Sequence, residues 1–148
     1  MRMFSAAVQI AALVFTVSPS LGADADHIGI VKTMAGQVVV DRGGRAVDAQ
    51  LNFRLYQGDV IRTGSNGKAG LILEDDTVIS MGNGSTLALR DFAFKPNDRK
   101  LSFVARVYQG TVSFISGQIA KLAPSLVHIE TPNATVGVRG THLLVRVD

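Results

Sequence analysis

The sequence contains no cysteine and no tryptophan, and only two of its 148 residues are tyrosine. Without cysteine, disulfide bonds, thiolate metal ligands, thiol nucleophiles and lipid anchors on cysteine are all excluded. The fold must therefore depend on an apolar core, which a chain of this length can build in a single domain.

The sequence also lacks a large excess of charge of either sign. Fifteen lysines and arginines face twelve acidic residues, which gives a formal net charge of +3. The basic residues are scattered along the chain, whereas a nucleic-acid interface gathers them on one face with aromatic residues between them. We interpret the charges as a solvated surface and expect no nucleic-acid partner.

Only one long apolar run occurs, at residues 4–17, and it follows the basic Arg2. Pro19 and a series of small residues come directly after it, an order that is typical of a secretory signal peptide. A bilayer span needs about 20 residues. The run is therefore too short to favour the alternative, an uncleaved membrane anchor.

We expect residues 1–25 to be a signal peptide that is cut after Gly22, Ala23 or Ala25. Residues 26–148 then form a single domain in the periplasm or outside the cell. This domain is expected to have no stable membrane span after cleavage.

Beyond this run, apolar and polar residues alternate with a period of two, which is the mark of half-buried strands. The alternation is clear in residues 68–74, 86–90, 101–107 and 127–131. The residues expected to face inward include Ala69, Leu71, Leu73, Leu87, Leu89, Leu101, Phe103, Ala105 and Val107. Residues 116–122 are the weak candidate for a helix.

Turn-forming residues separate the alternating runs, and their glycines and asparagines supply the positive φ that tight turns require. These turns are residues 41–44, 64–67, 74–77, 82–85 and 95–98. Three Gly-x-Val triplets, at residues 36–38, 58–60 and 110–112, indicate recurring corners in which Gly makes a bend and Val re-enters the core. Together these signals predict an all-β fold, either a solenoid-like β-roll or a two-layer β-sandwich.

Three blocks of the sequence form a recognisable set. The first, GDVIRTG at residues 58–64, precedes an alternating strand and an acidic turn, and the second is GTV at residues 110–112. The third and most specific is TPNATVGVRGT at residues 131–141. The set resembles the FecR-type periplasmic domain, with its G-D-x-I-x-T-G and T-P-x-A-x-V-x-V-R-G-T patterns. The matching residues are Gly58, Asp59, Thr63, Gly64, Gly110, Thr131, Pro132, Arg139, Gly140 and Thr141.

This resemblance implies a fold, a compartment and a role. The best-known relatives have a cytoplasmic anti-sigma segment, a transmembrane helix and a C-terminal receptor-contacting domain, and the chain resembles a stand-alone member without these parts. We expect an exported, non-enzymatic interaction module that binds a protein or cell-envelope partner and needs no cofactor. The alternative is a component of an envelope signalling system that acts through a separately encoded membrane protein.

The GVRGT stretch at residues 137–141 has two possible roles. A phosphate-binding loop needs a lysine after its last glycine and a helix behind it, and an alternating strand follows here instead. The favoured interpretation is structural, because the five donors of the Arg139 guanidinium can tie several carbonyls across a turn.

An enzymatic alternative rests on His128, Glu130 and His142. If residues 126–131 and 142–147 paired as antiparallel neighbours, Glu130 would lie near His142, and the three side chains could bind zinc in a small metal-dependent hydrolase. The competing interpretation is an exposed cross-strand pair without a metal. The sequence shows neither H-x-x-x-H nor H-x-H spacing, so we expect no metal site and no catalytic residues.

The final strand is the expected place for a partner. Residues 142–147 are half apolar, with Leu143, Val145 and Val147 on one face. We expect an exposed sheet edge here that binds a partner, such as a second copy of the chain, by strand addition or by packing. The alternative is a central strand that is already paired on both sides.

Overall fold

The computed structural model describes residues 26–138 and 140–148, and the expected signal peptide lies outside them. The described chain is built mainly of strands, which confirms the all-β prediction. The strands are β1 (Gly29–Ala35), β2 (Val38–Arg42), β3 (Arg45–Asp48), β4 (Arg54–Leu55), β5 (Val60–Thr63), β6 (Lys68–Leu73), β7 (Val78–Met81), β8 (Thr86–Lys95), β9 (Lys100–Ile115), β10 (Val127–Glu130), β11 (Thr135–Gly137) and β12 (His142–Val147). The helix α1 (Gln118–Leu122) confirms the weak helical signal, and two single turns, η1 (Pro96–Asp98) and η2 (Pro124–Leu126), complete the elements.

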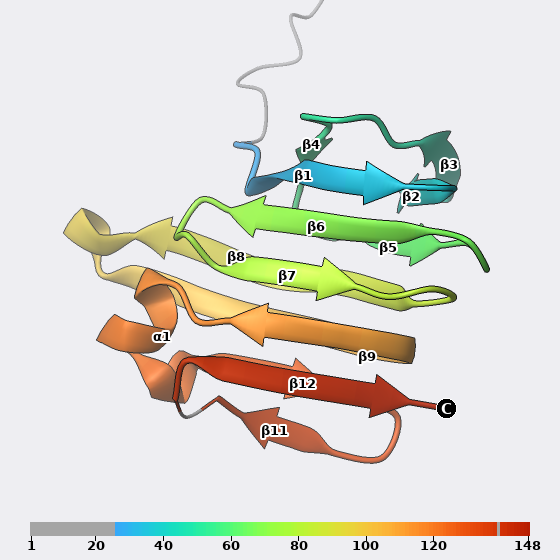
Figure 1. The fold of residues 1–148 in the computed structure, drawn as a ribbon. Helices are drawn as coiled ribbons and strands as arrows, with labels where there is room; N and C mark the ends of the chain where they lie inside the picture. The colour runs from blue at the N-terminus through green and yellow to red at the C-terminus, as the bar shows by residue number, and fades with distance from the viewer. Residues whose placement is uncertain (1–25, 139) are drawn as a thin grey trace, which may run out of the picture.

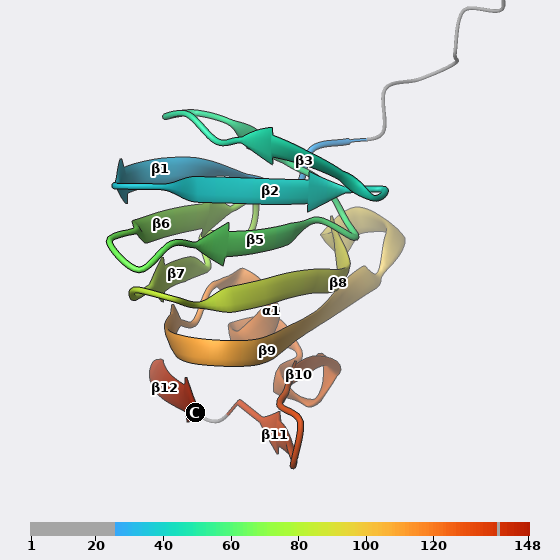
Figure 2. The ribbon, with the colours of Figure 1, turned by 90° about the vertical axis from the view of Figure 1, so that its right-hand side faces the viewer.

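The strands form one sheet that is folded over into two layers (Figure 1 and Figure 2). Layer A contains β4, β1, β6, β7, the second half of β9 and β12. Layer B contains β3, β2, β5, β8, the first half of β9, β10 and β11. The long strand β9 is thus shared by both layers and joins them along the middle of the molecule.

The Gly-x-Val triplets lie at three of the places where the chain crosses between layers. Gly36 joins β1 to β2, Gly58 lies between β4 and β5, and Gly110 lies at the bend within β9. Their φ angles of 63°, 91° and 92° are in the left-handed region that glycine adopts without strain. The predicted corners are confirmed, except that Val60 stays half-exposed and Ile61 enters the core in its place.

The core lies between the two layers. The residues that the alternation predicted to face inward are buried, and only Leu101 is half-buried while it packs against the same cluster. Phe92, Phe103 and Phe114 form an edge-to-face series, with ring centroids 5.9 Å and 6.4 Å apart. Because the side-chain period of a strand is two, strands such as β6 and β8 contribute one apolar face to this space.

The pairing of the last strands decides two sequence-based expectations. Within the described residues, β12 pairs antiparallel with β9 and with no second strand, so the predicted sheet edge is confirmed. The supposed pairing of residues 126–131 with residues 142–147 is wrong, because β10 pairs parallel with β9 and antiparallel with β11. Sequence pattern alone does not order strands, and here β9 is long enough to hold β10 and β12 on different halves.

Candidate functional site

The first motif block forms a charged clamp. The Arg42 guanidinium at the end of β2 makes a bidentate ion pair with Asp59, at 2.9 Å from Nε to Oδ1 and 2.8 Å from Nη2 to Oδ2. Its Nη2 also donates to the Arg54 carbonyl at 2.9 Å, and the Tyr56 backbone N–H donates to Asp59 Oδ2 at 2.8 Å. The guanidinium lies over the rings of Phe53 and Tyr56. The clamp therefore ties β2 to the turn that precedes β5.

Burial makes this clamp strong. Asp59 is 1% exposed, and every close partner that it has is a hydrogen-bond donor. Hydrogen bonding to Asp59 raises the pKa of the Arg42 guanidinium above its ordinary value, so the cation persists at any physiological pH. A buried carboxylate with charge-assisted bidentate bonds is costly to remove, because its partners are left without compensation.

Thr63 and Gly110, from the first and second motif blocks, meet in a latch between the layers. Thr63 Oγ1 donates to the Gly82 carbonyl at 2.7 Å and accepts from the Ser85 N–H at 2.8 Å. Ser85 Oγ in turn donates to the Thr111 carbonyl at 3.1 Å and accepts from the Thr111 N–H at 3.0 Å. A Cβ on Gly110 would collide with the Ser85 side chain. The motif glycine is therefore required both by its φ and by this close approach.

Gly64 serves the same region through its backbone. Its N–H donates to the Gln37 carbonyl at 2.9 Å, and its carbonyl accepts from the N–H groups of Gly67 and Gly84 at 2.9 Å and 3.0 Å. The backbone of Gly64 thus links three turns of the chain by hydrogen bonds. Both of its polar backbone groups have partners within the fold.

The acidic turn after β6 holds the helix. Asp75 is fully buried, and its carboxylate accepts from Thr77 N at 3.1 Å, Thr77 Oγ1 at 2.9 Å and Ile119 N at 3.1 Å. It thereby caps the first turn of α1, whose N-terminal N–H groups have no partner within the helix. Asp76 adopts φ 69°, in the left-handed region that aspartate tolerates better than most residues. The sequence indicated a turn here but gave no signal for the helix cap.

The third block begins with a small turn between β10 and β11. Thr131 N donates to the Ala134 carbonyl at 2.7 Å, and Thr131 Oγ1 accepts from Ala134 N at 3.1 Å. Pro132 is exposed at the second position of this turn, where its fixed φ is favourable. Both motif residues therefore contact their own turn rather than a cavity.

The end of the third block is attached to the end of β9. Ser116 Oγ donates to the Gly140 carbonyl at 2.8 Å, and Ser116 N donates to the Thr141 carbonyl at 2.9 Å. Gly140 has a φ of 98°, which again suits glycine. Arg139 lies outside the described residues, so its expected contacts with carbonyl groups stay a prediction.

The structure does not assemble the supposed zinc ligands. Glu130 pairs with Arg90 at 2.9 Å and with Arg106 at 3.6 Å on layer B, whereas His142 belongs to β12 of layer A. His128 is next to Glu130 on β10 and points to the same side of that strand. Among residues 26–138 and 140–148, no three His, Asp or Glu side chains lie close enough together to hold a metal ion.

A groove lies between the last strands of the two layers. We call it the open-end groove, and it has a volume of about 900 Å³. Its lining is mainly apolar and consists of Ala120, Pro124, Ser125, Val127, His128, Gly137, Val138, Gly140 and Leu143. Four exposed large apolar side chains come from the same part of the chain, namely Ile115, Leu122, Leu126 and Leu144. Sequence alternation indicated Leu143 as inward-facing, but it gave no signal for the groove.

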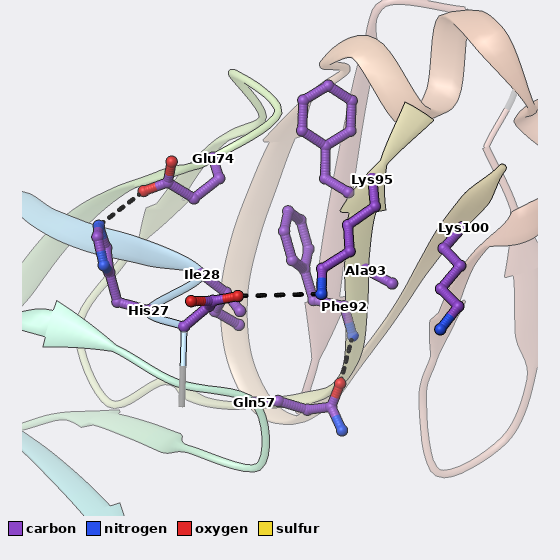
Figure 3. A pocket seen from close by; sticks show the side chains of 10 residues that line it. His27, Ile28, Gln57, Glu74, Phe92, Ala93, Lys95 and Lys100 are labelled. Atoms are coloured by element: carbon purple, nitrogen blue, oxygen red, sulfur yellow. Dashed lines mark hydrogen bonds and ion pairs between the residues drawn. The ribbon is translucent and has the colours of Figure 1, made fainter. Parts of the chain in front are cut away.

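A second cleft, of about 620 Å³, lies near the start of β1 and the hairpin between β8 and β9 (Figure 3). Its charged groups are largely paired with each other, His27 with Glu74 at 2.9 Å and Lys95 with Asp26 at 4.0 Å. Gln57 Oε1 accepts from the Phe92 N–H at 3.1 Å at its floor. Two pairs of side chains thus border the cleft, and Lys100 lines it without belonging to either pair.

The fold and these contacts define a two-layer β domain whose sequence motifs support its corners, turns and strand connections. Comparison with family models gives one match, described as "FecR protein", over residues 59–148. This match covers more than half of the chain, and the chain therefore belongs to the FecR family, as the three motif blocks predicted. The family is one of domains related to cell-envelope signalling. The same comparisons find no similar curated protein and no similar solved structure.

No helix in the described part of the chain is both long enough and apolar enough to cross a membrane.

Proposed function

We propose that the chain is an exported, non-enzymatic interaction module of the bacterial cell envelope that binds a protein partner through its open end. The observation that carries this proposal is the open-end groove, which is bordered by β12 with one unpaired edge. An exposed strand edge presents N–H and C=O groups that another chain can bind. Family membership supports the envelope setting, and the signal-peptide pattern of residues 1–25 supports export to the periplasm.

We further propose that the motif residues serve the fold rather than a ligand. The polar groups of Asp59, Thr63 and Gly64 form hydrogen bonds between turns. Gly110 has no side chain, which allows the close approach of Ser85. Since these residues are engaged within the fold, the exposed surface of the domain is left to carry the specificity. The free surface that such a framework presents at the groove is apolar, as expected for recognition of another protein.

A second form of this function is a component of an envelope signalling system that works with a separately encoded membrane protein. The family match supports it, since FecR domains are related to envelope signalling. The interaction surface is the same in both forms, and only the identity of the partner differs.

Site-specific photo-crosslinking in the intact envelope tests the proposal. A photoreactive residue at Leu144 or Leu126 reports on the open end, and one at Leu51, which is 59% exposed at the opposite end, is the matched control. We expect adducts from the open end only, and we expect Leu143→Glu to abolish them because it places a charge beside the groove. Equal adducts from Leu51, or none from the open end, would contradict the proposed binding surface.

A second measurement addresses export and catalysis. The mass of the protein from the native host is expected to correspond to a cut after Gly22, Ala23 or Ala25. Stoichiometric zinc in the purified protein that disappears in His142→Ala would instead favour the hydrolase alternative.

A further inference from the structure

We infer that β12 pairs with β12 of a second copy of this chain around a twofold axis at Val145, so that layer A continues from one copy into the other. This inference rests on the proposed function, because it names the partner that occupies the unpaired edge of β12.

The four edges of the described sheet differ in length and character. β4 has two residues, β11 has three, and β3 has four that are all exposed and include Arg45 and Asp48. Short strands and charged strands are the usual protection against pairing with another chain. β12 has six residues and contains three leucines or valines in succession, Leu143, Leu144 and Val145. Among the four terminal strands of the sheet in residues 26–138 and 140–148, it is thus the longest, and it lacks such protection along its centre.

The outer face of layer A leads to this edge as an apolar row. Strand register places Ile30 beside Ile72, Ile72 beside Val78, and Val78 beside Ile115. Ile115 then pairs with His142 on β12, and Leu144, which is 66% exposed, lies one step further along the same face. Ile30, Ile72 and Val78 are half-buried, and the exposed members of the row are Ile115 and Leu144, which lie nearest the edge. Apolar side chains gathered in this way indicate an interaction surface. A second copy joined at β12 would extend this row across the interface.

The register follows from side-chain alternation. His142, Leu144 and Arg146 face outward, whereas Leu143, Val145 and Val147 face the core. In an antiparallel pair, residues that lie opposite each other share a face, so the twofold axis must pass through a residue and not between two. This restricts the possible axes to single positions on β12.

Charge selects among these positions. An axis at Val145 places Leu144 opposite Arg146 of the second copy and His142 opposite its Asp148, while Leu143 meets Val147 on the inner face. An axis at Leu144 would place His142 opposite Arg146 and leave Asp148 opposite Gly140, without a side-chain donor across the interface. An axis at Arg146 would place two arginines directly opposite each other, which is destabilising.

The Arg146 and Asp148 side chains already lie close together within one copy, with Nε 3.1 Å from Oδ1. In the proposed pair, Asp148 would accept from both this guanidinium and the imidazole of the second copy. The Arg146 stem would cover the exposed Leu144 of the second copy, as long cationic side chains do on apolar surfaces. The same segment thus supplies both halves of each contact, as a twofold interface requires.

Disulfide trapping tests the register directly, because the chain has no cysteine of its own. Directly opposite residues on antiparallel strands have Cα atoms about 4.5–5.5 Å apart, which suits a disulfide. We expect Val145→Cys in the exported protein to form a covalent dimer under mild oxidation, and Leu144→Cys to form at most about a tenth as much. The reverse preference would overturn the proposed axis, and no dimer from either variant would overturn the pairing.

Sedimentation equilibrium with charge variants is the second test. We expect a reversible dimer in the unmodified protein and an about tenfold weaker one in Asp148→Lys, since the two symmetric contacts between His142 and Asp148 lose their acceptor. The double variant His142→Glu with Asp148→Lys places opposite charges at the same two positions and is expected to recover affinity to within about threefold. Asp98→Lys, an exposed position in η1, makes the same charge change away from the interface and should leave the dimer unchanged.

The outcomes separate this inference from the proposed function. A protein that stays monomeric up to about 1 mM overturns the second copy as partner. If photo-crosslinks from Leu144 then identify a different envelope protein, the proposed interaction module stands and only its partner changes. If the dimer forms but the crosslinked adducts are this chain alone, the second copy accounts for the whole surface.

Discussion

The two ends of the sandwich, which carry the N-terminal and the C-terminal strands, are built in different ways. At the N-terminal end the Arg42–Asp59 clamp joins β2 to the turn before β5, and Ala49 and Leu55 are buried beneath the connecting loop. At the C-terminal end the layers finish in β11 and β12 with the open-end groove between them. Polar side chains close the first end through specific bonds, whereas the second end keeps apolar surface exposed.

This difference suggests that one end of the domain serves mainly its stability and that the other end serves recognition of a partner. Buried ion pairs and hydrogen-bonded turns hold strands in one arrangement, and removing one partner is costly. An edge strand with one unpaired side must stay available if it is to bind another chain. We therefore expect substitutions to have large effects on stability at the clamp, intermediate effects at the corner and the helix cap, and small effects at β12.

The largest effect is expected from Asp59→Ala. This change leaves the Arg42 guanidinium and the Tyr56 N–H without their acceptor, and it should lower the free energy of unfolding by about 3 kcal/mol. Urea denaturation of the exported protein measures this change. Asp41→Ala removes the ion pair of Asp41 with the half-exposed Arg62 and is the control, with an expected loss below about 1 kcal/mol. Equal losses in the two variants would show that the buried clamp stabilises the fold no more than the exposed Asp41–Arg62 ion pair does.

Gly110→Ala is expected to cost about 2 kcal/mol, because alanine is strained at positive φ and its Cβ would meet Ser85. Gly137→Ala at the open end is the matched control, since a Cβ there meets nothing within 4 Å and its φ is not in the left-handed region. Thermal unfolding of both variants measures the contrast. A shift in Tm that is as large for Gly137→Ala as for Gly110→Ala would contradict the assignment of the corner.

Asp75→Ala is expected to lower the free energy of unfolding by about 1.5 kcal/mol through loss of the cap on α1 and of the bonds to Thr77. The amides of α1 should then exchange faster with solvent while those of β8 are unchanged. Asp76→Ala, in the same turn, removes an exposed hydrogen bond to Gln118. It also replaces a residue that is suited to positive φ. If the α1 amides exchanged faster in Asp76→Ala but not in Asp75→Ala, the residue that caps α1 would be Asp76 and not Asp75.

The smallest effect on stability is expected from Leu144→Lys. The side chain is 66% exposed, so the free energy of unfolding should change by less than about 0.5 kcal/mol. The same variant should lose binding at β12, because an added charge on an edge strand opposes pairing. Ser80→Lys, on the same outer face but on the central strand β7, is the control for added charge. A large loss of stability would mean that β12 supports the fold more than its exposure indicates.

The amino-acid sequence by itself determined the local features of this domain. Alternation identified the strand segments and their inward faces, and Gly-x-Val triplets marked the corners, because strand period and backbone φ are properties of short segments. The turn at Asp75 and Asp76 also followed from neighbouring residues. The family followed from three motif blocks, each of which is a short segment of the chain.

Only the tertiary structure decided which distant residues meet. Arg42 is 17 positions from Asp59, and Asp75 is 44 from Ile119, so no local pattern indicated the clamp or the helix cap. The alternative strand pairing that would have brought Glu130 near His142 does not form, because β10 and β12 pair with different halves of β9 in different layers. Strand order depends on contacts between segments far apart in sequence, and alternation is the same whichever neighbour a strand has. The open-end groove and the unpaired edge of β12 therefore belong to the fold as a whole.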